Sequence, residues 1–289
     1  MAQETLTRPR TLAPAQHRTA PRSKWGELAL RANALFSYFF LYAPIAILVI
    51  FSFSNSNFAG AWGGFTFEWY IRLFQNDRLM EALGNSLYVA FISMLIATVI
   101  GTMVALAMER FRFRGRTVFD AVLYLPIVIP DIVMAVMLLL FFSTGLQLIN
   151  NAFDMRIRPG LTTIIIAHVA FNISFVAVVV RASLRNFDWV LEEAAQDLGA
   201  NEIQTFTRIT LPIILPGILG GALLAFTLSL DDYIIAFFTT GPGASTLPIE
   251  VFSKIRRSVT PEINAISTVM LIASVGLVVM SQFFQRRRG

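Results

Sequence analysis

The amino-acid sequence predicts an all-α membrane protein with six transmembrane helices. Hydrophobic residues make up 56% of the chain, charged residues only 14%, and the mean hydropathy is +0.66. A soluble domain carries about 25% charged residues, so this deficit indicates a lipid environment. Two further observations define the topology: the lengths of the apolar segments, and the distribution of the basic residues between them.

Six apolar segments are each long enough for the ~20 residues that a spanning helix needs. They cover residues 33–54, 85–108, 118–142, 161–181, 213–238 and 264–284, within a transmembrane domain of residues 25–289. Residues 1–24 combine prolines with basic residues and lack an apolar period, which predicts a disordered cytoplasmic tail. The first segment starts after residue 30 and is too long for a cleavable signal peptide.

The basic residues predict the orientation. Of 23 Lys and Arg residues, 16 fall in the N-terminal stretch, the second and fourth loops, and the C-terminus. Because positive residues prefer the cytoplasm, both termini are expected inside the cell. Their placement in short runs between apolar segments indicates membrane orientation and argues against a nucleic-acid partner.

Several kinds of chemistry are excluded or disfavoured. The chain has no cysteine, which excludes disulfides, thiol catalysis and iron–sulfur clusters. Its only lysines, Lys24 and Lys254, each follow a serine, so no phosphate-binding Walker loop exists. Its only histidines, His17 and His168, are far apart in the sequence, which argues against a metal site or a catalytic triad. We therefore expect no catalytic residue, no metal and no cofactor bound by this chain.

The loop 187–212 is expected on the cytoplasmic side and predicts a short amphipathic helix. Asp188 can cap its N-terminus, and acidic residues in the first turn suit the helix dipole. Gly199 is placed to end the helix, because glycine readily adopts the left-handed conformation of a C-terminal cap. From these features alone the helix is either a connector lying on the membrane surface or a docking site for another protein.

The same loop resembles the EAA motif of ABC importer permeases. The motif reads Glu193-Ala194-Ala195, then Gly199 after three residues, Ile209 after nine more, and Leu211-Pro212 after one more. In that family the loop is a coupling helix that docks on a separate ATPase, which binds the ATP and magnesium. The resemblance implies ATPase-docking residues Glu192, Glu193, Ala194, Ala195, Asp197, Leu198 and Gly199.

Three acidic residues are predicted at membrane depth, where ionisable groups are costly and indicate function. Asp131 falls in the third segment, and Asp231 and Asp232 fall in the fifth, all in the outer half. The two adjacent aspartates approach the negative end of their helix, where a bound cation would stabilise them. Because neighbouring helical residues point ~100° apart, both are not expected to face one pathway. The alternative is that these acids lie at the interface or pair with an arginine of a neighbouring chain.

Polar residues on the fourth segment complete the candidate pathway. His168 and Asn172 lie one helical turn apart and could line a cavity, but an interhelical hydrogen bond is the more common role. The candidate substrate-pathway residues are therefore Asp131, Asp231, Asp232, Tyr233, His168 and Asn172.

The chain after residue 80 also resembles the polyamine (spermidine/putrescine) branch of these permeases. The resemblance is carried by the runs 125–126, 129–131, 198–200, 211–218, 226–233, 246–248 and 261–265. It implies the type I importer permease fold in the bacterial inner membrane. It also implies a heterodimer with a second six-helix permease, two copies of an ATPase, and a periplasmic substrate-binding protein.

Other functions stay open on the sequence. Within ABC importers, the substrate could be another small amine, an opine or a phosphonate, and a homodimer could replace the heterodimer. An ion-coupled secondary transporter would use Asp131 or Asp231 as a proton or sodium site, although it would have no need of a docking helix. A scaffold or sensor that transports nothing is the third class.

Overall fold

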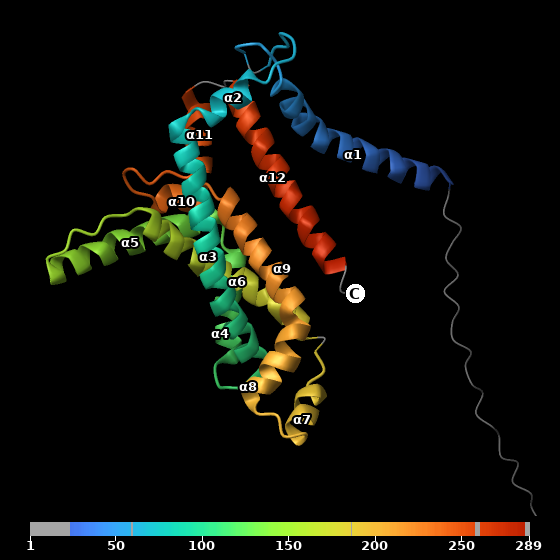
Figure 1. The fold of residues 1–289 in the computed structure, drawn as a ribbon, viewed down its shortest axis with the longest axis vertical. Coiled ribbons are helices and arrows are strands. Elements are labelled where there is room, and N and C mark those ends of the chain that lie inside the picture. Colours follow the sequence, from blue (N-terminus) through green and yellow to red (C-terminus); the bar gives the residue numbers. More distant parts are fainter. Residues whose placement is uncertain (1–23, 59, 186, 258–260, 287–289) are drawn as a thin grey trace, which may run out of the picture. The chain divides into compact units, whose positions relative to one another are not determined.

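The computed structural model describes residues 24–58, 60–185, 187–257 and 261–286, and these residues are almost entirely helical (Figure 1). Within them, β-structure amounts to a single antiparallel bridge between Ser54 and Phe65. The chain divides into two units, residues 1–47 and residues 48–289.

The first unit contains most of helix α1 (Lys24–Phe51). This helix begins nine residues before the predicted start of the first segment and includes Pro44. Its residues 25–51 are long and apolar enough to cross a membrane. The predicted tail, apart from Lys24, lies outside the described residues.

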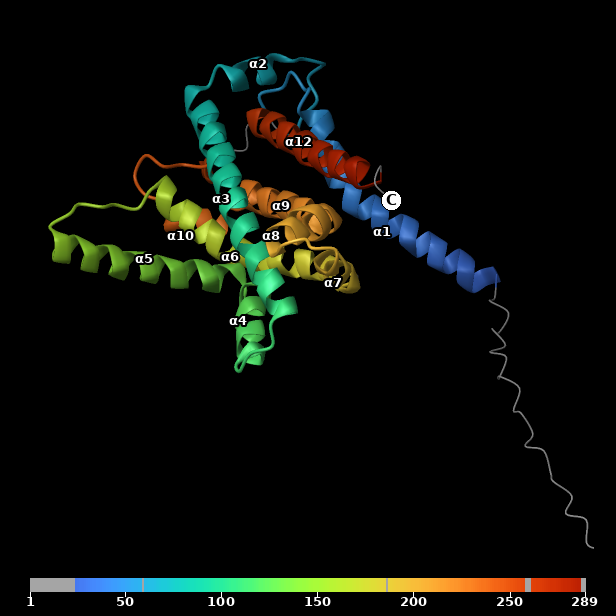
Figure 2. The ribbon, with the colours of Figure 1, turned by 60° about the horizontal axis from the view of Figure 1, so that its bottom comes forward.

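Three long helices form the centre of the second unit. Helix α3 (Asp77–Arg110) packs along α6 (Leu161–Leu184), and both pack against α9 (Leu211–Asp231). Figures 1 and 2 both show these helices side by side. Small residues line the contacts, because without a hydrophobic driving force in lipid, helices associate through close van der Waals packing.

Two glycines show how close these helices lie. A Cβ added to Gly101 of α3 would lie 2.8 Å from the Cβ of Val176 on α6. A Cβ added to Gly217 of α9 would lie 2.0 Å from the Oγ of Ser183 on α6. Since real Cβ contacts are not this short, a side chain at either position would force Val176 or Ser183 on α6 to move.

The third apolar segment is interrupted, contrary to the prediction of one span over 118–142. Helix α4 (Arg116–Val128) ends at Ile129, which is extended, and α5 (Asp131–Phe153) starts after Pro130. Proline has no N–H to donate and disfavours a helical conformation in the residue before it. The helix long enough to span is therefore α5, and Asp131 lies in its first turn, where the dipole favours an acid.

The fifth segment is also interrupted. Asp232 is extended after α9, and α10 (Ile234–Thr239) follows as a separate short helix that packs against α5. The predicted helix over 213–238 is therefore two helices. The cause is a side chain, since the carboxylate of Asp232 accepts hydrogen bonds from the N–H groups of Ile235 (3.3 Å) and Ala236 (2.7 Å).

Two short helices, α2 (Glu68–Phe74) and α11 (Leu247–Arg257), lie in loops predicted on the outer side. The last helix of the chain is α12 (Pro261–Arg286). By length and hydropathy, five helices of the described chain qualify as membrane spans: α1, α3, α5, α6 and the continuous helical stretch Glu202–Asp231. The described part of α12, Pro261–Gly276, is a shorter apolar helix, at the position of the sixth predicted segment.

Candidate functional site: a coupling helix and an acidic cleft

The loop after α6 forms the predicted helix, α7 (Val190–Asp197). The side chain of Asp188 accepts a hydrogen bond from the N–H of Val190 at 3.1 Å, close to the predicted capping role. At the other end Gly199 has φ +88°, which confirms the left-handed cap. The N–H groups of Gly199 and Ala200 bond to the carbonyls of Gln196 and Ala195, so the helix ends in a Schellman motif.

The docking residues predicted from the motif divide into two groups. Glu193, Ala194, Asp197, Leu198 and Gly199 are exposed, and Ala195 is partly exposed. Glu192 differs, because its side chain is only 7% exposed and is bound within the chain. The exposed face of α7 therefore excludes Glu192, although the sequence placed it among the docking residues.

Two further helical segments connect α7 to the membrane. Helix α8 (Glu202–Thr205) starts at a capping box made by Asn201 and Gln204. It continues into a π-helical turn, η1 (Phe206–Thr210), which runs directly into α9. A π-helical turn is rare and is often found at functional sites.

His168 connects α6 to the interruption after α9. Its Nδ1 lies 2.5 Å from the Oγ of Ser229, and its Nε2 lies 3.2 Å from a carboxylate oxygen of Asp232. The imidazole is buried, with 1% exposure. The interhelical hydrogen bond predicted as the more common role is thus present.

The two adjacent aspartates face different surroundings because α9 ends at Asp231 and Asp232 lies beyond it in an extended conformation, not because of their spacing on one helix. Asp232 is bound to His168 and to the first N–H groups of α10, at the positive end of that helix. The expectation that the dipole disfavours Asp232 is therefore wrong. Asp231 is exposed and faces a cleft.

This cleft has a volume of about 440 Å³ and is bounded by the end of α9, by α11 and by α12. Its polar lining comes from Asp231, Ser267 and Ser274. Its aromatic lining comes from Tyr233 and Phe252, whose ring centroids lie 4.3 Å apart. A carboxylate beside aromatic faces and apolar side chains suits a cation that carries a hydrocarbon chain.

The other two candidate pathway residues lie elsewhere. Asp131 is exposed at the start of α5 and is not among the residues that line this cleft. Asn172 is fully buried on α6, and neither its Oδ1 nor its Nδ2 has a hydrogen-bond partner among the described residues. Of the six candidates, the structure therefore brings Asp231 and Tyr233 to the cleft and pairs His168 with Asp232.

The described residues contain no group of three or more His, Cys, Asp and Glu side chains arranged to hold a metal ion. The acidic residues of the site are instead separated into the cleft, the interruption after α9 and the inner loop.

An ion cluster that the sequence pattern does not predict lies at the C-terminal end of α6. Arg181 donates to Glu109 of α3 at 2.9 Å and to Asp120 of α4 at 2.6 Å. The arginine side chain is 8% exposed. Its charge is neutralised by two acids that lie 61 and 72 residues away in the sequence, so the sequence pattern does not reveal the pairing.

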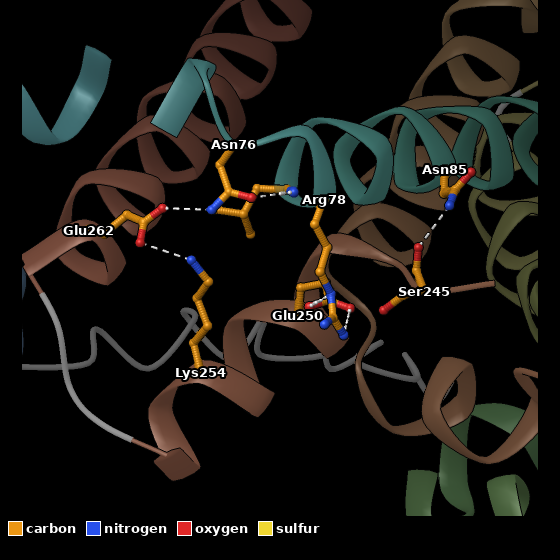
Figure 3. Close-up of polar contacts among 8 residues, drawn as sticks. Asn76, Arg78, Asn85, Ser245, Glu250, Lys254 and Glu262 are labelled. Atoms are coloured by element: carbon orange, nitrogen blue, oxygen red, sulfur yellow. Dashed lines mark hydrogen bonds and ion pairs between the residues drawn. The ribbon is translucent and has the colours of Figure 1, made fainter. Parts of the chain in front are cut away.

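A polar network fixes α11 at the other end of the unit (Figure 3). The guanidinium of Arg78 on α3 lies 2.9 Å from the carboxylate of Glu250, which is 5% exposed. Glu262 of α12 accepts from Asn76 at 3.1 Å and from Lys254 of α11 at 2.9 Å. The network holds one wall of the cleft, since α11 contributes residues to it.

Replacing Arg78 with alanine is expected to destabilise the fold by about 1–3 kcal/mol, because the buried carboxylate of Glu250 loses its charged donor. Thermal unfolding of the purified protein in detergent measures the loss. The control is Arg31→Ala, because the partner of Arg31, Glu27, is 50% exposed. Losing this exposed ion pair is expected to cost about 0.5 kcal/mol. Equal shifts for the two variants would contradict a role of the Arg78–Glu250 pair in fixing α11.

Comparison with known proteins places the fold and the site in context. Residues 97–287 match the family described as binding-protein-dependent transport system inner membrane component. The putrescine transport system permease protein PotI of Escherichia coli K12 is 45% identical over 89% of this chain and 89% of its own. The spermidine/putrescine permease protein PotC of Haemophilus influenzae is 41% identical over 86% of this chain and 93% of its own.

A solved structure agrees with the arrangement of the helices. The crystal structure of a bacterial ABC transporter that imports the acidic polysaccharide alginate matches with a TM-score of 0.73, covering 91% of this chain and 96% of that chain at 20% identity. This likeness supports the all-α permease fold predicted from the sequence. The chain belongs to the family of inner membrane components of binding-protein-dependent transport systems.

Proposed function

We propose that this chain is the translocation subunit of an ATP-driven importer that carries polyamines, such as putrescine and spermidine, into the cytoplasm. The observation that carries the proposal is the 45% identity to the putrescine permease PotI along 89% of both chains. The cleft supports it, because the carboxylate of Asp231 beside the rings of Tyr233 and Phe252 suits an alkylammonium group.

The proposed assembly follows from the family. This chain pairs with a second permease of the same fold, two copies of an ATPase dock on the cytoplasmic side, and a periplasmic binding protein delivers the substrate. ATP and magnesium are bound by the ATPase, and this chain is not catalytic. Both termini lie in the cytoplasm, as the basic residues indicate.

The proposed docking surface is the exposed side of α7. Glu193, Asp197 and Leu198 present charged and apolar groups on this surface, and Ala194 allows a partner to approach closely. Closure of the ATPase dimer on ATP would move this helix and its counterpart together. The two permeases would then rock as rigid bodies between outward-open and inward-open states.

The alternatives make different predictions. Another small amine, an opine or a phosphonate would leave the assembly unchanged and replace only the substrate. An ion-coupled secondary transporter would need no ATPase, and membership of a binding-protein-dependent family favours the importer. A scaffold or sensor would show no uptake.

Uptake of labelled putrescine and spermidine into proteoliposomes containing the whole complex tests the proposal. Asp231→Asn is expected to lower uptake at limiting substrate by about 10- to 100-fold, since a hydrogen bond to a charged group contributes about 1.5–3 kcal/mol. Asp154→Asn is the control, because Asp154 is exposed, does not line the cleft, and has a left-handed conformation that asparagine tolerates. Unchanged uptake by Asp231→Asn would show that the cleft is not part of the substrate pathway. Absence of uptake of either polyamine by the wild type would contradict the proposal that polyamines are the substrate.

A further inference from the structure

The side chain of Glu192 connects the coupling helix to two helices of the core. The next residue, Glu193, begins the motif and is exposed, whereas the side chain of Glu192 is buried on a different side of α7. One carboxylate oxygen of Glu192 accepts a hydrogen bond from the hydroxyl of Thr210. The other lies 3.0 Å from the guanidinium of Arg110.

Thr210 ends the π-helical turn η1, immediately before α9. The N–H of Leu211 bonds to the carbonyl of Phe206, five residues earlier, and Pro212 follows without an N–H of its own. The wide turn and the missing donor both interrupt the regular hydrogen-bond ladder between the loop and α9. Such an interruption is a place where a helix can change direction.

Arg110 is the last residue of α3, so the same carboxylate also reaches the end of the second core helix. Helices α3 and α9 are both packed against α6. A displacement of α7 therefore has a direct polar path to α9 through Thr210 and to α3 through Arg110. Glu192 and Thr210 are both buried, so their hydrogen bond is shielded from bulk water, whereas the Arg110 side chain is 44% exposed and its ion pair is partly screened.

We propose that Glu192 is the residue that transmits movement of the docked coupling helix to the spanning helices α3 and α9. It is a positioning residue, which does not contact the ATPase or the substrate. This role rests on the proposed function, and it separates Glu192 from the first glutamate of the motif: Glu193 binds the partner, and Glu192 converts the partner's movement into movement of the core.

The test uses the complete complex in nanodiscs and proteoliposomes with the binding protein present. Three quantities are measured: the amount of ATPase that co-purifies, the rate of ATP hydrolysis, and the polyamine taken up per ATP hydrolysed. Glu192→Gln keeps the shape and the acceptor for Thr210 but loses the charge that pairs with Arg110. Glu192→Ala loses both contacts, and Thr210→Val removes the hydroxyl alone.

We expect each variant to retain the ATPase while uptake per ATP falls, by about tenfold for Glu192→Ala, within the roughly 5- to 150-fold range of coupling between sites. The charge-swapped pair Arg110→Glu with Glu192→Arg is expected to recover part of the loss, because it restores the ion pair. Glu202→Ala, which changes an exposed acid of the same loop, is the control and is expected to behave as the wild type.

Two results would overturn the role of Glu192. Wild-type uptake per ATP in Glu192→Ala and Glu192→Gln would show that the carboxylate transmits nothing. Loss of the ATPase from Glu192→Gln would make Glu192 part of the docking surface. Failure of the wild-type complex to bind any ATPase is a distinct outcome, which would overturn the proposed function itself and this role with it.

Discussion

Arginine in place of Glu193 is expected to release the ATPase from the complex. Glu193 is exposed on α7, so the substitution leaves the fold of this chain intact and reverses the charge that faces the partner. Losing one member of a charge pair in an interface costs about 2–5 kcal/mol, which corresponds to roughly 30-fold weaker binding or more. Co-purification of the ATPase and ATP hydrolysis by the membrane-bound complex measure the effect.

The control for this variant is Glu81→Arg, which makes the same charge change at an exposed position near the N-terminus of α3. We expect this control to retain the ATPase. If both variants retain it, the exposed side of α7 is not the docking surface, and the motif has another role in this chain.

Methionine in place of Arg181 is expected to give the largest loss of stability. The substitution leaves Glu109 and Asp120 without their shared cation, and breaking a buried ion pair costs about 3–5 kcal/mol. The lower end of this range is expected, because the side chains of Glu109 and Asp120 are 19% and 29% exposed. The fraction of monodisperse protein and its thermal unfolding in detergent measure the loss.

The combined variant Arg181→Met, Glu109→Gln and Asp120→Asn distinguishes lost charge balance from lost packing. Neutralising both acids removes the unpaired buried charge, so most of the stability is expected to return. An Arg181→Met protein that unfolds at the wild-type temperature would show that the cluster does not hold α3, α4 and α6 together.

Much of the fold could be predicted because lipid imposes simple rules on a sequence. The long apolar segments became helices, and the cap at Gly199 followed from the conformational freedom of glycine. The interruption at Pro130 was also readable in principle, since proline disfavours helix in the residue before it. Hydropathy concealed it, because α4 and α5 are apolar on both sides of the break.

The interruption at Asp232 and the orientation of Glu192 could not be read from the sequence. No proline marks the interruption at Asp232. Its cause is the Asp232 carboxylate, which accepts hydrogen bonds from the N–H groups of Ile235 and Ala236 and also contacts His168, 64 residues away. For the second, an eight-residue helix is too short for periodicity to show which acid faces the protein. The partners Arg110 and Thr210 decide it, and they lie on other helical elements.

The separate roles of the three aspartates in the candidate pathway also depend on contacts that the sequence does not show. The sequence indicated three acids at membrane depth, but their separate roles depend on which helix ends lie nearby. Asp131 starts α5, Asp232 caps α10, and Asp231 alone of the three lines the cleft beside Tyr233. Helix breaks therefore decide which of these residues is available to a substrate.

The most direct test of the account is ATP hydrolysis by the complex in nanodiscs, with the binding protein, in the presence and absence of putrescine or spermidine. The account predicts that polyamine-loaded binding protein stimulates hydrolysis, and that Glu193→Arg abolishes the stimulation. Hydrolysis that responds to the binding protein but not to polyamines would contradict the substrate. Absence of any ATPase bound to this chain would contradict the central claim that it is the translocation subunit of an ATP-driven importer.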